Sequence, residues 1–186
     1  MSSRYPPRPP SAPLIVEDRG LSQVPPVRHP PHAASPPRAA QAARASRYRS
    51  VDELGRLDRI ETVRGGVPAR TLTALADDMA IPREQLFVWL GLSRATANRK
   101  IRDDALLNQD ESERTLGLAR LLGAVERIAA ESGAPEGFDA PAWAAQWLQE
   151  PVPALGGRAP AEFLSTADGR AMAASLILQM QSGAYA

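Results

Sequence analysis

Few residues of this chain could carry out catalysis or hold a metal. Its 186 residues include no cysteine, and both histidines, His29 and His32, lie in a proline-rich stretch. This excludes a cysteine nucleophile and a thiolate metal site, and argues against a histidine-based triad. The acidic pairs Asp77-Asp78 and Asp103-Asp104 are adjacent in sequence, so they diverge on a helix instead of facing one another. The sequence therefore predicts a binding protein that uses neither cofactor nor metal, and not an enzyme.

The residues best suited to recognition lie between 82 and 102, which read PREQLFVWLGLSRATANRKIR. An apolar helix, a Gly-x-Ser turn and a basic helix form a helix-turn-helix arrangement. Gly91 allows the turn, Ser93 caps the second helix, and Ile101 faces inward. Arginine can pair with guanine, asparagine with adenine, and lysine with phosphate. The candidate DNA contacts are Arg94, Thr96, Asn98, Arg99, Lys100 and Arg102.

Charge divides the chain into a basic tail and an acidic body. The first 49 residues hold eight arginines and two acids, and the remainder holds 14 basic and 19 acidic residues. Eleven of the 18 prolines precede residue 38, which predicts a disordered tail over 1–48. The tail is interpreted as a solvated linker or the product of an upstream start, with a DNA-binding arm as the alternative. The acidic body counts against strong DNA binding by a monomer, so a merely solvated polar face stays open.

The body is predicted to be all-α, because no segment alternates with period two. Ser50-x-x-Glu53 is interpreted as a capping box that starts a helix ending at Gly65-Gly66. A long helix starts at Asp110 or Ser112 and ends at Gly133. The other predicted helices cover Leu72–Met79, Pro82–Leu90, Ser93–Arg102, Asp139–Trp147, Pro160–Leu164 and, after a break at Gly169, Met172–Met180.

The segment from Trp143 to the C-terminus contains an ordered series of turn and anchor residues. Trp143 and Trp147 lie one helical turn apart and are predicted to be buried. Thr166 is predicted to form a local cap. The series runs Trp147-Leu148, Pro151, Ala154-Leu155-Gly156-Gly157, Pro160, Phe163-Leu164, Thr166, Gly169 and Gly183-Ala184-Tyr185-Ala186. It resembles the toxin-binding domain of the Xre/MbcA/ParS antitoxins.

The resemblance implies two domains after the tail. In that family an Xre-type helix-turn-helix domain precedes the toxin-binding domain, as residues 71–102 do here. The segment Glu111–Arg114, which leads into a long apolar helix, resembles the family's linking region. The expected organisation is a disordered tail over 1–48, an Xre-like helix-turn-helix domain over 49–110 and a helical toxin-binding domain over 111–186.

The resemblance also implies a function for the last four residues. In the family the C-terminus enters the toxin's active-site cleft and blocks it, so Gly183, Ala184, Tyr185 and Ala186 are the expected toxin-binding residues. Gly183 would let the backbone bend, Tyr185 would fill a pocket, and the Ala186 carboxylate would pair with a basic group. The alternative is an ordinary frayed terminus. The expected partner is a cognate toxin with a RES domain that degrades NAD, or with a related ADP-ribosyl-transferring fold.

Two functions are consistent with these observations. The first is a type II antitoxin that works as a homodimer, neutralises its toxin and represses its own operon by binding operator DNA. The alternative is a stand-alone transcriptional regulator whose C-terminal domain serves for dimerisation. No apolar run approaches the ~20 residues of a membrane span, and the N-terminus lacks the apolar stretch of a signal peptide. We therefore expect a cytoplasmic protein without a membrane partner.

Overall fold

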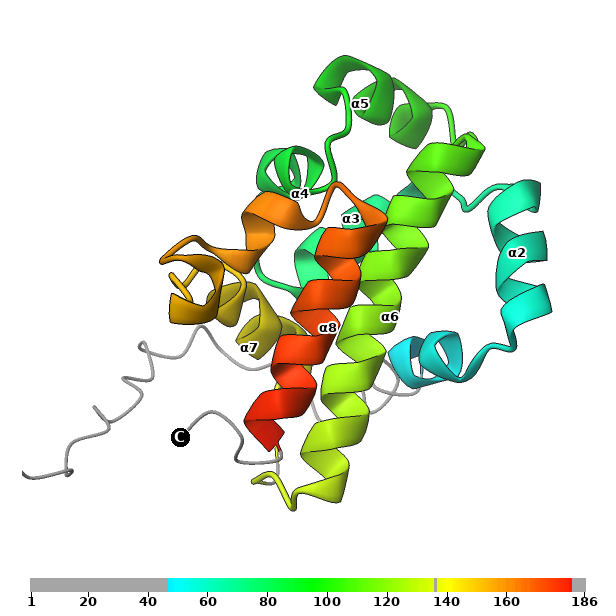
Figure 1. Ribbon diagram of the computed structural model, residues 1–186. Coiled ribbons are helices and arrows are strands. Elements are labelled where there is room, and N and C mark those ends of the chain that lie inside the picture. Colours follow the sequence, from blue (N-terminus) through cyan, green and yellow to red (C-terminus); the bar gives the residue numbers. More distant parts are fainter. Residues whose placement is uncertain (1–46, 136, 182–186) are drawn as a thin grey trace, which may run out of the picture. The chain divides into compact units, whose positions relative to one another are not determined.

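The computed structural model describes residues 47–135 and 137–181, and this part of the chain is all-α (Figure 1). Its extended pairings are two isolated bridges, Pro68–Leu106 and Val152–Arg158. No helix among the described residues is long and apolar enough to cross a membrane. The elements are a helix over 47–53, α2 (Arg56–Gly65), α3 (Arg70–Asp78), α4 (Arg83–Trp89), α5 (Arg94–Arg102), α6 (Gln109–Glu131), α7 (Ala140–Trp147), the 3-10 turns η1 (Pro153–Leu155) and η2 (Pro160–Phe163), and α8 (Ala167–Gln181).

Most helix ends lie where local sequence signals predicted them. Gly66 follows α2 with a φ of 87°, which a side chain would disfavour. Pro82 directly precedes α4. Asp139 caps α7, because its carboxylate accepts a hydrogen bond of 3.2 Å from the Ala142 amide. The predicted cap at Thr166 is confirmed, since its hydroxyl accepts a 3.1 Å hydrogen bond from the Gly169 amide.

The start of the helical body was predicted wrongly. The expected single helix from Ser50 is two helices, which are separated at Leu54 and Gly55. The first already includes Arg47 and Tyr48, so Ser50 lies inside it and does not begin it. The reason is a long-range contact: Tyr48 is 2% exposed, and its hydroxyl donates a 2.5 Å hydrogen bond to Asp78 on α3. The part of the predicted tail before residue 47 lies outside the described residues.

Two further helix boundaries differ from the prediction. The long helix α6 begins at Gln109, because Asn108 forms a reciprocal capping box with Glu111. Gly169 does not separate helices; it lies in the first turn of α8. There it allows close packing, since a Cβ on Gly169 would lie 1.9 Å from the carbonyl oxygen of Phe163.

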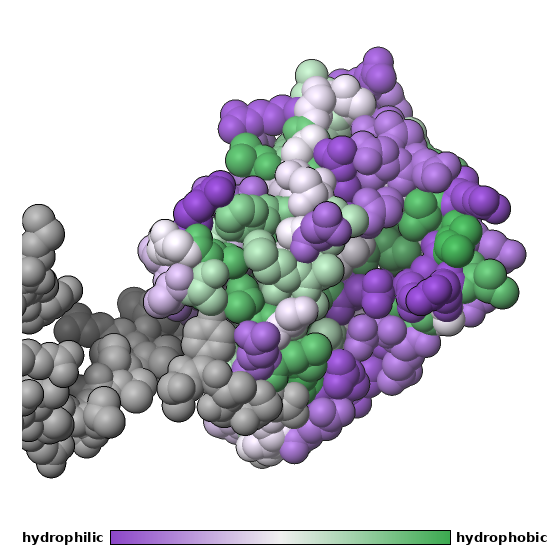
Figure 2. Space-filling model, viewed as in Figure 1, coloured by the Kyte–Doolittle hydropathy of each residue, from purple (hydrophilic) through white to green (hydrophobic). Residues whose placement is uncertain are grey.

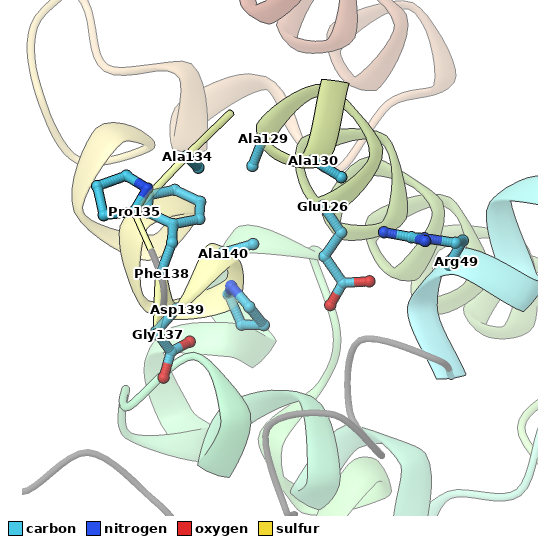
Figure 3. Close-up of a pocket in the computed structure, with 11 residues that line it drawn as sticks. Arg49, Glu126, Ala129, Ala130, Ala134, Pro135, Gly137, Phe138, Asp139 and Ala140 are labelled. Carbon is cyan, nitrogen blue, oxygen red and sulfur yellow. The ribbon is translucent and has the colours of Figure 1, made fainter. Parts of the chain in front are cut away.

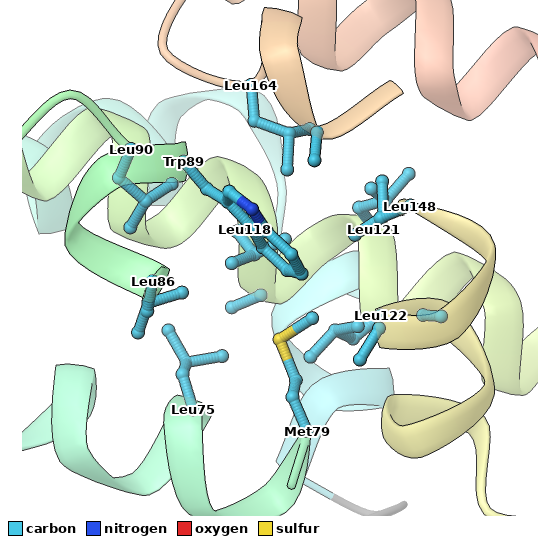
Figure 4. Packing of buried hydrophobic residues seen from close by; sticks show 14 of the residues in the cluster. Leu75, Met79, Leu86, Trp89, Leu90, Leu118, Leu121, Leu122, Leu148 and Leu164 are labelled. Atoms are coloured by element: carbon cyan, nitrogen blue, oxygen red, sulfur yellow. The ribbon is translucent and has the colours of Figure 1, made fainter. Parts of the chain in front are cut away.

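Helix α6 lies at the centre of the structure. It packs against α2, α3, α7 and α8, which come from both predicted domains. Leu118 and Leu122 of α6 are fully buried, and they lie among side chains from α3, α4 and the C-terminal helices (Figure 4). The predicted domain boundary at 110/111 therefore lies at the start of a helix that serves one shared core.

We expect Gly169→Ala to destabilise the protein. The added methyl group would press on the backbone of η2, so the free energy of unfolding should fall by about 1–3 kcal/mol despite alanine's better helix propensity. Thermal and urea denaturation would measure this. Gly65→Ala is the matched control, because nothing lies within 4 Å of that Cβ position. It should leave the stability unchanged or raise it by up to about 1 kcal/mol. Equal losses in both variants would contradict the packing argument.

Candidate functional site

The predicted helix-turn-helix is formed by α4, a tight turn and α5. Gly91 has a φ of 63°, and the Leu92 amide donates a 2.8 Å hydrogen bond to the carbonyl oxygen of Phe87. Phe87 is fully buried, although this position in such motifs usually holds a small residue. The Arg114 guanidinium donates hydrogen bonds of 3.1 Å to Leu90 and 3.0 Å to Gly91, both to carbonyl oxygens. These bonds tie the turn to α6 and fix the direction of α5.

Helix α5 packs through one face and exposes a basic one. Ala97 is 3% exposed and Ile101 packs against the core. Ser93 occupies the N-cap position, but its side chain makes no capping hydrogen bond. The helix contains no acidic residue. Of the six candidate contacts, Arg94, Asn98, Arg99 and Arg102 are exposed, and Thr96 is half-buried.

The sixth candidate, Lys100, is directed toward α6. Its ammonium group pairs with the Glu111 carboxylate, and the two side chains are only 17% and 13% exposed. The Glu111 carboxylate also accepts a hydrogen bond from the Asn108 backbone amide at the start of α6. By pairing with Glu111, Lys100 therefore stabilises the junction between α5 and α6. Arg102 is exposed but lies 3.1 Å from Asp103. The exposed candidate contacts on α5 without an ionic partner in the described structure are thus Arg94, Asn98 and Arg99.

The second predicted site is the C-terminus that follows α8. Gly183, Ala184, Tyr185 and Ala186 lie outside the described residues. The helix that carries them is firmly attached at its start, where Arg170 is 6% exposed and pairs with Glu113 of α6. Arg170 also donates a 2.8 Å hydrogen bond to the carbonyl oxygen of Leu164. At the other end of α8, Leu178 and Met180 are 46% and 41% exposed.

The two tryptophans of α7 are structural. Trp143 and Trp147 stack with ring centroids 6.2 Å apart and planes 7° apart. Trp147 is 7% exposed, and Trp143 packs against the core. The prediction that this pair is buried is confirmed for Trp147, while Trp143 is partly exposed and also contacts Phe138.

Comparison with known proteins identifies both halves of this arrangement. Residues 58–120 match the antitoxin Xre-like helix-turn-helix domain, and residues 136–183 match the antitoxin Xre/MbcA/ParS C-terminal toxin-binding domain. A relative named Prs ADP-ribosylating antitoxin, from Sphingobium sp. (strain YBL2), is 39% identical over 139 residues. The alignment covers 75% of this chain and 87% of the relative. The chain belongs to the Xre/MbcA/ParS antitoxin family.

The antitoxin is of type II and binds a toxin; the family is not enzymatic. Its toxin-binding domain includes α7, η1, η2 and α8. The match to this domain decides against the alternative in which the C-terminal helices serve only for dimerisation. The matched helix-turn-helix domain extends to residue 120, well inside α6. The two matched regions are thus joined by the second half of one continuous helix and the loop after it.

The antitoxin also contains a cavity that sequence reasoning missed. It measures about 240 Å³ and lies between α6, the loop before α7 and residue 49. Figure 3 shows Glu126 reaching from α6 into it, with Arg49 on one side and Phe138 on the other. Glu126 is 7% exposed, and its Oε2 atom has no hydrogen-bond partner in the described structure. A lone glutamate in a helix usually marks a solvated face, so no sequence signal revealed this burial.

The environment of Glu126 favours its neutral form. Burial raises the pKa of this carboxyl from 4.5 to about 8, and the nearby Asp139 acts in the same direction. A hydrogen bond from the Arg49 backbone and the charges of Arg49 and Arg47 oppose the rise. A protonated carboxyl can remain in this mostly apolar cavity at a small cost, whereas a carboxylate cannot.

We expect Glu126→Gln to stabilise the antitoxin at high pH. Because the pKa of Glu126 is raised in the folded state, the contribution of this side chain to the free energy of unfolding is complete below about pH 4.5. It is lost as the pH rises through about 8. Glutamine cannot ionise, so the variant should gain on the order of 4 kcal/mol relative to wild type between pH 5 and pH 9. Urea denaturation at both pH values measures the difference. Glu150→Gln, at an exposed position, is the control and should show no such gain; an identical response of both variants would refute the assignment.

Proposed function

We propose that this antitoxin neutralises a toxin that consumes NAD, by inserting Gly183–Ala186 into the toxin's active site. The observation that carries the proposal is the position of α8 in the matched toxin-binding domain, immediately before these residues. The name of the relative refers to ADP-ribosylation, a reaction in which NAD is the donor. The ADP-ribosyl-transferring fold is therefore the favoured partner, and a RES toxin that degrades NAD is the alternative.

A rigid α8 supports such a plug. Its first turn is packed against η2 at Gly169 and bonded through Arg170 to Leu164 and Glu113. Ala173, Leu176 and Ile177 then bury one face of α8 in the core. A fixed helix delivers the residues that follow it to a constant position, which lowers the entropy lost on binding.

The last described turn of α8 exposes two large apolar side chains, on different sides of the helix. Leu178 and Met180 are both more than one-third exposed. Apolar side chains of this size contribute binding free energy when a partner covers them, and methionine adapts to irregular surfaces. We propose that the toxin surface around its active-site entrance packs on these two residues.

The end of the chain has the chemistry needed to occupy an NAD site. The pyrophosphate of NAD requires basic or amide groups in the toxin. The Ala186 carboxylate would pair with those groups, and Tyr185 would take an apolar subsite. The antitoxin would thereby compete with the substrate directly.

We expect removal of Gly183–Ala186 to abolish protection from the toxin. The change lies beyond the described end of α8, so the melting temperature should stay within about 1 °C of wild type, because the packed core is untouched. The assay is growth after induction of the adjacent open reading frame, the expected source of the toxin in this proposal, together with consumption of NAD by its product. Tyr185→Ala should weaken protection, while Glu61→Ala, at an exposed position of α2 outside the matched toxin-binding domain, is the control. Full protection by the truncated chain would refute the plug.

The toxin's reaction can be assigned in the same experiment. An ADP-ribosyl-transferring toxin would label an acceptor with the ADP-ribose part of radiolabelled NAD. A RES toxin that degrades NAD would consume it without labelling an acceptor. In both cases addition of the full-length antitoxin should stop the reaction.

We further propose that the antitoxin represses its own operon as a homodimer, with α5 in the major groove. Arg94, Asn98 and Arg99 are exposed and unopposed by acids within the helix. Thr96 and Arg102 flank them, and Lys100 reaches a phosphate only if it leaves Glu111. Two copies would present two basic helices, which offsets the acidity of the body.

We expect Arg94→Ala combined with Arg99→Ala to impair repression and spare toxin binding. Loss of two arginine contacts should weaken operator binding about 10-fold or more, whereas α8 is unaffected. Gel-shift assays with the DNA upstream of the operon and co-purification with the toxin measure the two activities. Arg56→Ala combined with Arg83→Ala removes the same charge from exposed positions outside α5 and outside the matched toxin-binding domain, and is the control. Unchanged operator binding by the α5 variant would exclude this face from DNA recognition.

A further inference from the structure

A second cavity lies between α2 and α6, away from both α5 and the end of α8. Its volume is about 320 Å³, within the range of small-molecule sites. Ile60, Val63 and Leu116 form an apolar wall. None of the ten residues of α2, all of them described, is buried, so the cavity is open to solvent. In Figure 2, hydrophobic and hydrophilic side chains lie next to one another over α2.

The rim of this cavity is strongly basic. Four arginines line it: Arg56, Arg59 and Arg64 from α2, and Arg120 from α6. One acid, Glu113, is among the lining residues, and it is already paired with Arg170. No ion pair of the described structure involves Arg56, Arg64 or Arg120. The antitoxin body carries more acids than bases, so four arginines at one cavity are a local reversal of its charge.

Arg120 is the residue that most clearly lacks a partner. Its Nε atom is buried and has no hydrogen-bond partner in the described structure. Burial and the neighbouring Arg59 lower the pKa of its guanidinium, and Asp52 only partly opposes them. The residue as a whole is half-buried, but a buried N–H group without a hydrogen-bond partner is costly. The guanidinium fork also matches the oxygens of a phosphate.

We infer that the cavity between α2 and α6 binds a small phosphorylated molecule, with the phosphate held by Arg120 and the α2 arginines. Arginine binds phosphate bidentately, which satisfies several N–H groups at once. The apolar wall of Ile60, Val63 and Leu116 faces the remainder of the ligand and favours a ring over a bare ion. The ligand class is therefore a nucleotide-sized phosphate monoester.

The experiment uses the full chain and three probes: AMP, inorganic phosphate and adenosine, each at up to about 10 mM in low-salt buffer. AMP should raise the melting temperature by several degrees, because a ligand that binds only the folded state stabilises it. Inorganic phosphate should give a smaller rise, since it lacks the ring, and adenosine should give none. Calorimetric titration with AMP then provides the dissociation constant. A melting temperature unchanged by AMP would overturn the inference, and an equal response to phosphate and AMP would overturn the role of the apolar wall.

Two variants and a control separate binding from folding. Arg120→Met should weaken AMP binding about 10-fold and raise the melting temperature of the free protein, because it removes a half-buried charge whose buried Nε atom has no hydrogen-bond partner in the described structure. The double change Arg56→Gln and Arg64→Gln alters exposed residues only, so it should fold normally and weaken AMP binding as well. Arg83→Met removes one positive charge from an exposed position that does not line the cavity and is the matched control. Loss of AMP binding in the control to the same extent as in Arg120→Met would show a general charge effect and refute the site.

Discussion

Burial of α6 on several sides at once is the constraint on which the rest of the structure depends. Leu121, Leu122 and Gly123 are consecutive and all buried, so neighbours surround the helix at this level. Gly123 makes this possible, because a Cβ there would lie 2.2 Å from the carbonyl oxygen of Tyr48. Helix α6 must accommodate four neighbours at once: the helix over 47–53, α3, α7 and α8. The Xre-like helix-turn-helix half and the toxin-binding half therefore share a single core.

This constraint explains which parts of the fold could be predicted from the sequence. Pro82, Asp139 and Thr166 act on neighbouring residues, and their effects on the helix ends were predicted correctly. The failures involve residues whose partners are distant in sequence. Tyr48 joins a helix because it reaches Asp78, thirty residues away. Gly169, which sequence rules interpret as a break, is needed within α8 because η2 approaches it closely.

The same distinction between local effects and contacts distant in sequence applies to the candidate functional residues. The exposed basic face of α5 could be predicted because helical periodicity places Ala97 and Ile101 on the opposite side. The pairing of Lys100 with Glu111 could not, since it depends on how α5 meets α6. The arginine-lined cavity was also missed. Its arginines come from 56–64 and from 120, and they form no cluster until α2 packs on α6.

Three charged side chains of this antitoxin, two of them buried and one half-buried with a buried Nε atom, meet the cost of desolvation in different ways. Arg170 is paired with Glu113 and bonded to Leu164, so its charge is compensated within the fold. Glu126 lies in an apolar cavity and takes up a proton, which removes the charge. Arg120 can do neither, because a guanidinium stays charged near neutral pH and no acid of the described structure pairs with it. Its neighbours are further arginines, which increase the cost instead of reducing it. A fold that compensates Arg170 and neutralises Glu126 yet leaves Arg120 unpaired has a site that an anion from outside the chain completes.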